Sequence, residues 1–132
     1  MTDYRPIDPQ DFQAVRQLLA DSGWQTRVQD PVRFQKMMER ADRTIVVVED
    51  SRIIGFARAL CDDVSNGYIS MVVVAADKRG KGIGTEMVRR LIADDGDRNI
   101  TWVLRAGKDS GSFWRKLGFT ESQVAMERLR RA

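Results

Sequence analysis

The order of the predicted elements indicates a mixed α/β fold, with one sheet that carries helices on both faces. Two apolar faces at helical spacing come first, β-branched runs follow, and a helix then separates the last of these runs from a later strand. Tight turns between the early strands favour antiparallel hairpins, whereas the strand–helix–strand segment favours a crossover. Because 132 residues suffice for one core, we expect a single domain over residues 1–132.

A short strand over residues 4–7 and two helices are predicted in the first third of the chain. The pairs Asp8-Pro9 and Asp30-Pro31 each place a capping acid before a proline at the first helical position. Gly23 ends the first helix. The apolar residues of the two helical faces are Phe12, Val15, Leu18 and Leu19, and then Phe34, Met37, Met38 and Ala41.

The middle of the chain predicts three strands. Residues 44–49 and 52–60 are rich in β-branched side chains and flank the turn Asp50-Ser51. Gly55 marks a bulge or a close approach within the second strand. The turn Ser65-Asn66-Gly67 leads into a third strand over residues 68–75.

The last third predicts a helix that ends near Ala93, a loop over residues 94–99 and a strand over residues 100–106. Asp109 is expected to cap a short helix through Leu117, and Gly118 to end it. A final strand is expected over residues 119–126.

The composition excludes several kinds of protein. The chain has no histidine, which removes Ser–His and Cys–His nucleophile pairs and the usual histidine metal sites, so we expect no metal. Its single cysteine, Cys61, cannot form an internal disulfide, and no charged-then-apolar leader opens the chain; both favour a cytoplasmic location. Apolar runs are too short to cross a bilayer, and we expect no membrane partner.

A glycine-rich loop between a β-branched strand and a helix is the strongest functional signal. Gly80, Gly82 and Gly84 occupy every second position after Arg79, with Lys81 between them. Glycine lets the backbone turn sharply and approach another molecule closely. The helix N-terminus offers unpaired N–H groups and a positive dipole end, to which the two cationic side chains add charge. The loop predicts an anion site, most naturally for a phosphate or pyrophosphate.

Two well-known phosphate motifs do not fit this loop. A P-loop requires Ser or Thr after Gly-Lys, but Gly82 follows Lys81. The dinucleotide fingerprint requires a glycine where Thr85 stands. The residues leave two alternatives open: a pyrophosphate loop of another type, or a plain turn that links strand to helix.

A second motif follows the loop after one strand and one helix. Residues 113–119 read Phe-Trp-Arg-Lys-Leu-Gly-Phe, which by itself is an amphipathic helix end with a glycine cap. Together with Arg-Gly-Lys-Gly-Ile-Gly at residues 79–84, it resembles the GCN5-related N-acetyltransferase (GNAT) superfamily, whose motifs read Arg/Gln-x-x-Gly-x-Gly/Ala and Phe/Leu-Tyr-x-Lys-Leu-Gly-Phe. The resemblance covers residues 4–119 and implies a GNAT-like fold, with a mostly antiparallel sheet splayed at the cofactor-binding strands.

The resemblance also implies acetyl-CoA as cosubstrate. Backbone N–H groups of the loop would bind the CoA pyrophosphate, and the pantetheine arm would lie between the strands at residues 68–75 and 100–106. Main-chain groups near Val72 to Val74 would polarise the thioester carbonyl. The implied cofactor-binding residues are Val72, Val73, Val74, Arg79, Gly80, Lys81, Gly82, Ile83, Gly84, Thr85, Ser110 and Phe113.

The implied reaction is direct attack of a primary amine, on a small molecule or peptide, at the acetyl carbonyl. An alkyl ammonium with a pKa of about 10.4 is mostly protonated at pH 7, so a base or a water chain must remove a proton. Tyr68 stands where relatives often have a strand Glu, with Ser70 on the same face. Trp114 stands where relatives often have a Tyr acid, and an indole N–H does not give up its proton. These two positions are the catalytic candidates, and the role at Trp114 is open.

Other side chains allow two interpretations each. Glu49, Asp62 and Asp63 are the nearest carboxylates by topology, and each is either a base or a solvated turn charge. Trp24 either borders the acceptor site or packs on the core, whereas Trp102 is most simply a core residue.

Two functions fit these residues, and a third does not. The first is an acetyl-CoA-dependent N-acetyltransferase, and the alternative is a CoA-binding module of the same fold that has lost its chemistry and serves as a sensor or partner. A nucleic-acid binder would show an arginine-rich stripe interleaved with aromatics, which is missing, so we expect no nucleic-acid partner. The acceptor is open, as is the choice between monomer and homodimer.

Overall fold

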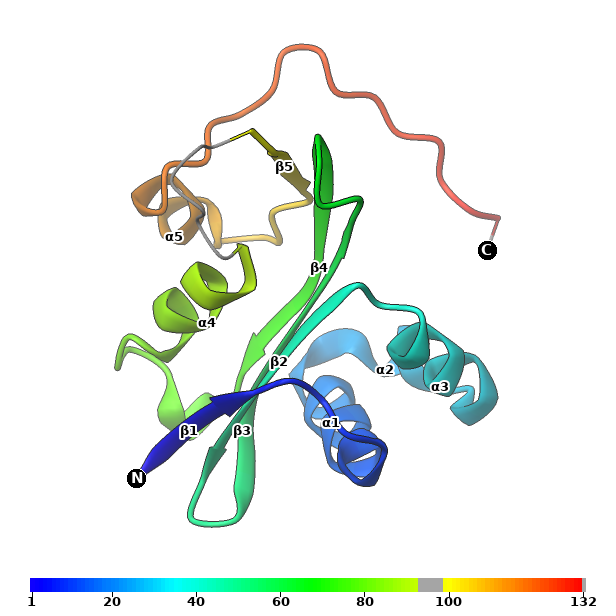
Figure 1. Cartoon of the computed structure of the whole chain (residues 1–132), viewed down its shortest axis with the longest axis vertical. Coiled ribbons are helices and arrows are strands. Elements are labelled where there is room, and N and C mark those ends of the chain that lie inside the picture. Colours follow the sequence, from blue (N-terminus) through cyan, green and yellow to red (C-terminus); the bar gives the residue numbers. More distant parts are fainter. Residues whose placement is uncertain (93–98, 132) are drawn as a thin grey trace.

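The computed structural model describes residues 1–92 and 99–131, and it arranges the strands of this part in one open sheet of order β1-β2-β3-β4-β5. The first four strands pair antiparallel, and β5 pairs with β4 in parallel. Figure 1 shows α1, α2 and α3 on one side of the sheet and α4 and α5 on the other. The predicted mixed α/β fold, mostly antiparallel with helices on both faces, is confirmed. The strands are β1 (Thr2–Arg5), β2 (Arg43–Glu49), β3 (Arg52–Cys61), β4 (Asn66–Val74) and β5 (Thr101–Leu104), and the helices are α1 (Phe12–Leu19), α2 (Gln25–Val28), α3 (Pro31–Glu39), α4 (Ile83–Ile92) and α5 (Gly111–Lys116).

Each face of the sheet has its own apolar core. Val15, Leu19 and Phe34 from the first three helices pack on Val46, Phe56 and Val73 of the sheet. Met87, Val88 and Leu91 of α4 pack on the opposite face with Val47, Ile54 and Ile69. The two cores hold β3 and β4 in the middle of the molecule, where both of their faces are covered.

The helix starts follow the predicted chemistry. The Asp30 carboxylate accepts the backbone N–H groups of Val32 and Arg33 at 3.0 and 3.2 Å and caps α3. Before α1, a 3-10 turn (Pro9–Asp11) follows Asp8. Here Asp11 does more than favour the helix dipole: it is buried, binds both guanidinium nitrogens of Arg5 at 2.7 and 3.0 Å, and accepts the Asp8 N–H at 2.8 Å.

The first hairpin turn and three glycines are also as expected. Asp50 and Ser51 both have positive φ, at 51° and 64°, which is the backbone of a tight two-residue hairpin. Gly55 lies beside a register shift in β2–β3, and a Cβ on it would lie 3.0 Å from Cγ2 of Val47. Gly23, with φ of 96°, turns the chain out of α1, and Gly118, with φ of 93°, ends α5.

Several predicted boundaries were wrong. Asn66 and Gly67 belong to β4 rather than to a turn, and the turn before it is made by residues 62–65. Gly67 is required there because a Cβ would lie 2.3 Å from the Trp102 ring. The short helix α2 was not expected, and the N-cap of α5 is Ser110 rather than Asp109.

The predicted final strand over residues 119–126 is not formed. Phe119 packs back on Trp114, with ring centroids 5.4 Å apart, and the chain then leaves the sheet without pairing with β5. Val124 and Met126 are exposed, so alternating apolar residues here lack a surface to cover. The predicted end of α4 at Ala93 and the loop over residues 94–98 lie outside the described residues. Within the described part, no helix is long and apolar enough to cross a membrane.

Candidate functional site

A gap opens in the sheet between β4 and β5. The parallel ladder joins Asn66–Ile69 to Thr101–Leu104 and stops there. β4 continues to Val74, while the segment that follows β5 turns away toward α5, as Figure 1 shows. The β5-side edge of residues 70–74 therefore has no strand beside it within the described residues. The predicted splay of the two strands is confirmed.

A β-bulge lies at the head of this gap. Phe56 pairs with Val73, but Arg58 pairs with Ser70, so Met71 and Val72 together face Ala57. Met71 has φ of 63°, in the left-handed region that L side chains rarely adopt. Such a bulge bends the strand and takes backbone groups out of the ladder. No local pattern indicates this bulge, because Met is not a residue type that favours positive φ.

The glycine loop, residues 79–84, lies at the far end of β4. Gly80 and Gly82 have φ of 78° and 84°, and a Cβ on either would meet no atom within 4 Å, so their backbone faces open space. Gly84 lets Phe113 approach closely, because a Cβ there would lie 3.3 Å from Cε1 of Phe113. α4 begins at Ile83, so the N–H groups of its first turn have no partner within the helix. The structure brings the loop, Thr85, the end of β4 and Phe113 together.

Two cations of the loop remain without a carboxylate among the described residues. Arg79 and Lys81 are exposed, and neither forms an ion pair there. Arg79 instead donates from Nε to the Val74 carbonyl at 3.0 Å, on the strand that borders the gap. A positive, backbone-rich surface at a helix N-terminus is suited to bind an anion.

Ion pairs fix the 3-10 turn (Ala76–Lys78) that precedes the loop. Arg52 binds both carboxylate oxygens of Asp77 at 2.9 Å and lowers the pKa of that carboxyl to about 2. Lys78 donates to Glu49 at 2.6 Å. These contacts connect the β2–β3 hairpin to the start of the glycine loop.

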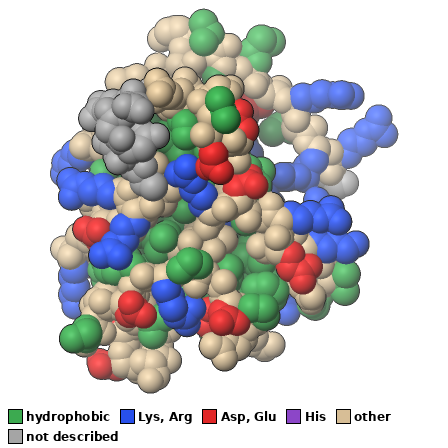
Figure 2. Space-filling view, viewed as in Figure 1, with side chains coloured by type: hydrophobic (Ala, Val, Ile, Leu, Met, Phe, Trp, Pro, Cys, Tyr) green, Lys and Arg blue, Asp and Glu red, His purple; other side chains and the backbone are tan. Residues whose placement is uncertain are grey.

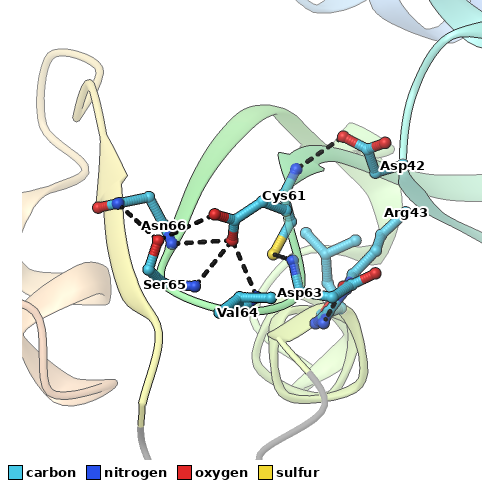
Figure 3. A network of polar contacts seen from close by, with 9 residues as sticks. Asp42, Arg43, Cys61, Asp63, Val64, Ser65 and Asn66 are labelled. Carbon is cyan, nitrogen blue, oxygen red and sulfur yellow. Dashed lines mark hydrogen bonds and ion pairs between the residues drawn. The ribbon is translucent and has the colours of Figure 1, made fainter.

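The three carboxylates that are candidate bases bind groups in or beside turns. Glu49 binds Lys78 and Thr2 at the hairpin end of β2, whereas Tyr68 lies beside Leu60 near the opposite end of β3. Asp62 accepts the N–H groups of residues 64, 65 and 66, which hold its pKa far below the usual range, and Asp63 pairs with Arg43 at 2.8 Å (Figure 3).

Arg43, at the start of β2, contacts three neighbouring parts of the chain. It donates to the Leu91 carbonyl at the end of α4 at 3.0 Å, binds Asp63, and its guanidinium lies 5.2 Å from the centroid of the Trp102 ring. Asp42 beside it accepts the Cys61 N–H at 2.7 Å (Figure 3). The start of β2 thus positions α4, the turn before β4, and β5.

The remaining candidates lie in different surroundings. Tyr68 is half-buried on the half of β4 that pairs with β5, next to Val103. Trp114 is a core residue, with its ring edge-on to Phe113 at 4.9 Å and to Phe119 at 5.4 Å. The Ser110 hydroxyl donates to the Gly107 carbonyl at 2.8 Å within its own turn. In the described residues, no group of three His, Cys, Asp or Glu side chains could hold a metal ion.

Comparisons with known proteins point in one direction. A family model described as an acetyltransferase (GNAT) domain matches residues 40–121. An uncharacterized N-acetyltransferase, ycf52, of Porphyra purpurea is 33% identical over 108 residues, which are 80% of this chain and 62% of that protein. The chloroplastic serotonin N-acetyltransferase 2 of Oryza sativa subsp. japonica is 31% identical over 116 residues, 83% of this chain and 56% of that protein.

The fold is shared with solved structures. A GNAT-family protein of Xanthomonas campestris pv. campestris superposes with a TM-score of 0.80 at 22% identity, covering 98% of this chain and 94% of the other. The chain spans about three-fifths of the length of the curated relatives it matches.

Proposed function

This chain belongs to the GNAT acetyltransferase family, and we propose that it forms one GNAT domain that moves an acetyl group from acetyl-CoA to a primary amine. The observation that carries the proposal is the gap between β4 and β5, with a glycine loop at one end and a β-bulge at the other. A flat turn between strand and helix would need neither open backbone nor a strand edge without a partner.

The glycine loop supports the binding of the CoA pyrophosphate. Its free N–H groups, the α4 N-terminus and the charges of Arg79 and Lys81 all favour a diphosphate. The pantetheine arm then runs along the open edge of residues 72–74, and Phe113 lies beside it at the start of α4. Arg79 must leave the Val74 carbonyl for an amide of the arm to pair there, which frees its guanidinium for a phosphate.

The chemical step requires few side chains. The amine nitrogen attacks the acetyl carbon, the C–S bond breaks, one proton leaves the nitrogen and the CoA sulfur gains one. Backbone N–H groups released at the Met71 bulge are suited to stabilise the developing oxyanion. Tyr68 and Ser70 are the protic side chains on this half of β4, and we assign Tyr68 to proton transfer toward the sulfur.

Trp114 is not assigned a catalytic role. An indole cannot act as an acid, and the ring is buried between two other aromatic rings. With a thiol pKa of about 8.5, release of a thiolate at pH 7 costs only about 2 kcal/mol relative to the thiol. The family's usual tyrosine acid is therefore dispensable in this chain.

Transfer is tested by incubating the protein with acetyl-CoA and a panel of primary amines, with thiol release and the mass of the acetylated product as readouts. We expect product formation that requires both the protein and an amine. Firm acetyl-CoA binding without any acetylated product would instead support the alternative, a CoA-binding sensor module. Absence of binding would mean that the glycine loop is only a turn.

A further inference from the structure

Arginine side chains gather on the face of the sheet that carries α1–α3, beside the β4 bulge. Arg58 of β3 is half-buried and pairs in register with Ser70, next to the bulge. Its Nε donates to the Met37 carbonyl at 3.4 Å, which leaves its two terminal nitrogens without a described protein partner. Arg58 thus presents a fork of donors near the position where the acetyl carbon would lie.

Arg27 comes from α2, which packs on the same face of the sheet as Arg58. Its guanidinium lies 6.0 Å from the centroid of the Trp24 ring, and the side chain is half-buried. Burial lowers the pKa of Arg27, and the charges of Arg130 and Arg105 lower it further. Burial and the charge of Arg27 likewise lower the pKa of Arg58. The charges of Arg105 and Arg130 thus act on Arg27, and the charge of Arg27 acts on Arg58, and we refer to these four side chains as the arginine cluster.

Tyr68 lies diagonally across the β3–β4 ladder from Arg58, because Arg58 pairs with Ser70 and Leu60 pairs with Tyr68. Across the parallel ladder, Tyr68 pairs with Val103, two residues before Arg105. The C-terminal segment, which contains Arg130, runs past the ends of β5 and β4 in Figure 1. Figure 2 shows Lys and Arg side chains gathered over that segment and the α2–α3 side.

The cluster is not neutralised within the described residues. Of the ion pairs found there, only Arg105–Glu127 involves a member, and both of these side chains are more than half exposed. Asp42 raises the pKa of Arg58, but no ion pair joins the two among the described residues, and the Asp42 carboxylate accepts the Cys61 N–H. Arg27 and Arg58 are half-buried, and half-buried like charges are unfavourable unless an anion joins them.

On the premise of the acetyltransferase function above, we propose that the acceptor is a primary amine that also carries a carboxylate or phosphate group, which the arginine cluster binds. Guanidinium groups bind both anions through paired N–H donors. A simple ammonium or a polyamine is repelled by the cluster, whereas an anionic group offsets this repulsion. The same positive field lowers the pKa of the bound ammonium and so increases the neutral amine fraction, in a site where no described carboxylate serves as base.

The proposal is tested with pairs of primary amines, in which one member carries an anionic group and the other lacks it. The carboxylate arm compares β-alanine with β-alanine amide, the phosphate arm compares O-phosphoethanolamine with ethanolamine, and putrescine is the cationic probe. At saturating acetyl-CoA we expect kcat/KM to be at least about tenfold higher for the anionic member of one pair, mainly through KM. Equal or faster acetylation of β-alanine amide and ethanolamine, or of putrescine, would overturn the proposal.

Arginine variants identify the source of the preference. Arg27→Gln and Arg58→Gln should each reduce it by about tenfold, whereas Arg89→Gln on the exposed face of α4 is the matched control and should not change it. Arg58→Gln also removes the contact with Met37, so Arg27→Gln keeps the test decisive if the first variant is unstable. A preference that survives both variants would overturn the assignment.

A binding measurement covers the case in which no amine of the panel is acetylated. Glutarate and inorganic phosphate are titrated calorimetrically into the acetyl-CoA-bound protein. Binding of either that is lost in Arg27→Gln supports the proposal, and absence of binding of both overturns it. Loss of acetyl-CoA binding itself would count against the proposed function instead, so the two failures are distinguishable.

Discussion

The two ends of β4 are built in different ways. At the Val72–Val74 end, the gap is bordered by main chain, and the adjoining glycine loop is contiguous in sequence. At the Tyr68–Ser70 end, the neighbouring side chains come from β3 and β5, and α2 packs on the same face. A site built from main chain is sensitive to an added Cβ or charge, whereas a site built from remote side chains can change its ligand through single substitutions. We infer that the first end holds the cosubstrate and that the second selects the acceptor.

The largest expected effect is at the main-chain end. Gly82→Glu places a side chain and a negative charge where φ is 84°, in the middle of the glycine loop. Left-handed backbone costs about 1–2 kcal/mol for a non-glycine residue, and the carboxylate repels phosphate. We expect acetyl-CoA to bind at least about 100-fold more weakly by calorimetry.

Gly118→Glu is the matched control, because Gly118 has φ of 93° and open space around it but lies at the end of α5. It should lose stability without losing acetyl-CoA affinity. Equal affinity losses in the two variants would mean that the loop is not the phosphate site.

The next effect concerns the ion pair between Arg5 of β1 and Asp11, just before α1. The Arg5 guanidinium holds the pKa of Asp11 below its usual range, and the Asp11 side chain is only 7% exposed. Because the folded pKa is lower than the unfolded value of about 3.9, this stabilisation is present above about pH 4 and is lost as pH falls through the folded pKa. Asp11→Asn should lower the free energy of unfolding at pH 7 by about 2 kcal/mol and flatten the acid limb of the stability profile.

Urea unfolding between pH 2 and 7 measures this difference. The exposed Asp3→Asn is the control, and its profile should parallel that of the unchanged protein. An Asp11→Asn profile as steep as the original would show that another group carries the acid sensitivity.

A smaller effect is expected at the junction of β4 and β5. A Cβ on Gly67 would lie 2.3 Å from the Trp102 ring, so Gly67→Ala forces the indole to move. We expect the free energy of unfolding to fall by about 1.5 kcal/mol in urea. The double variant Gly67→Ala, Trp102→Leu should lose less than the sum of the two single losses. Strict additivity would contradict the contact.

The smallest predicted effect is catalytic. Tyr68→Phe removes the phenol proposed to protonate the departing thiolate, but water can replace it at pH 7. We expect kcat to fall by about fivefold and acetyl-CoA affinity to stay unchanged. A loss above about 100-fold would assign Tyr68 a larger role, and no loss would remove it from the mechanism.

The comparison also explains what could be predicted from the sequence. Local patterns indicated the helix caps at Asp30, the hairpin turn at Asp50 and Ser51, and the glycine loop, because each depends on neighbouring residues. The bulge at Met71, the role of Gly67 and the arginine cluster depend on contacts between remote segments. The same holds for residues 119–126, whose β-like pattern finds no partner strand in the described part of the chain.

The most direct test of the central claim is the thermal unfolding of the protein with acetyl-CoA, free CoA and ATP. A site filled at about 100 times its Kd adds about 2.7 kcal/mol, or roughly several degrees in Tm for a domain of this size. We expect this rise with both CoA species and a much smaller one with ATP, which lacks the pantetheine arm that the open edge of β4 is proposed to bind. An unchanged Tm with acetyl-CoA and CoA would contradict it, and the gap between β4 and β5 would not be a cosubstrate site.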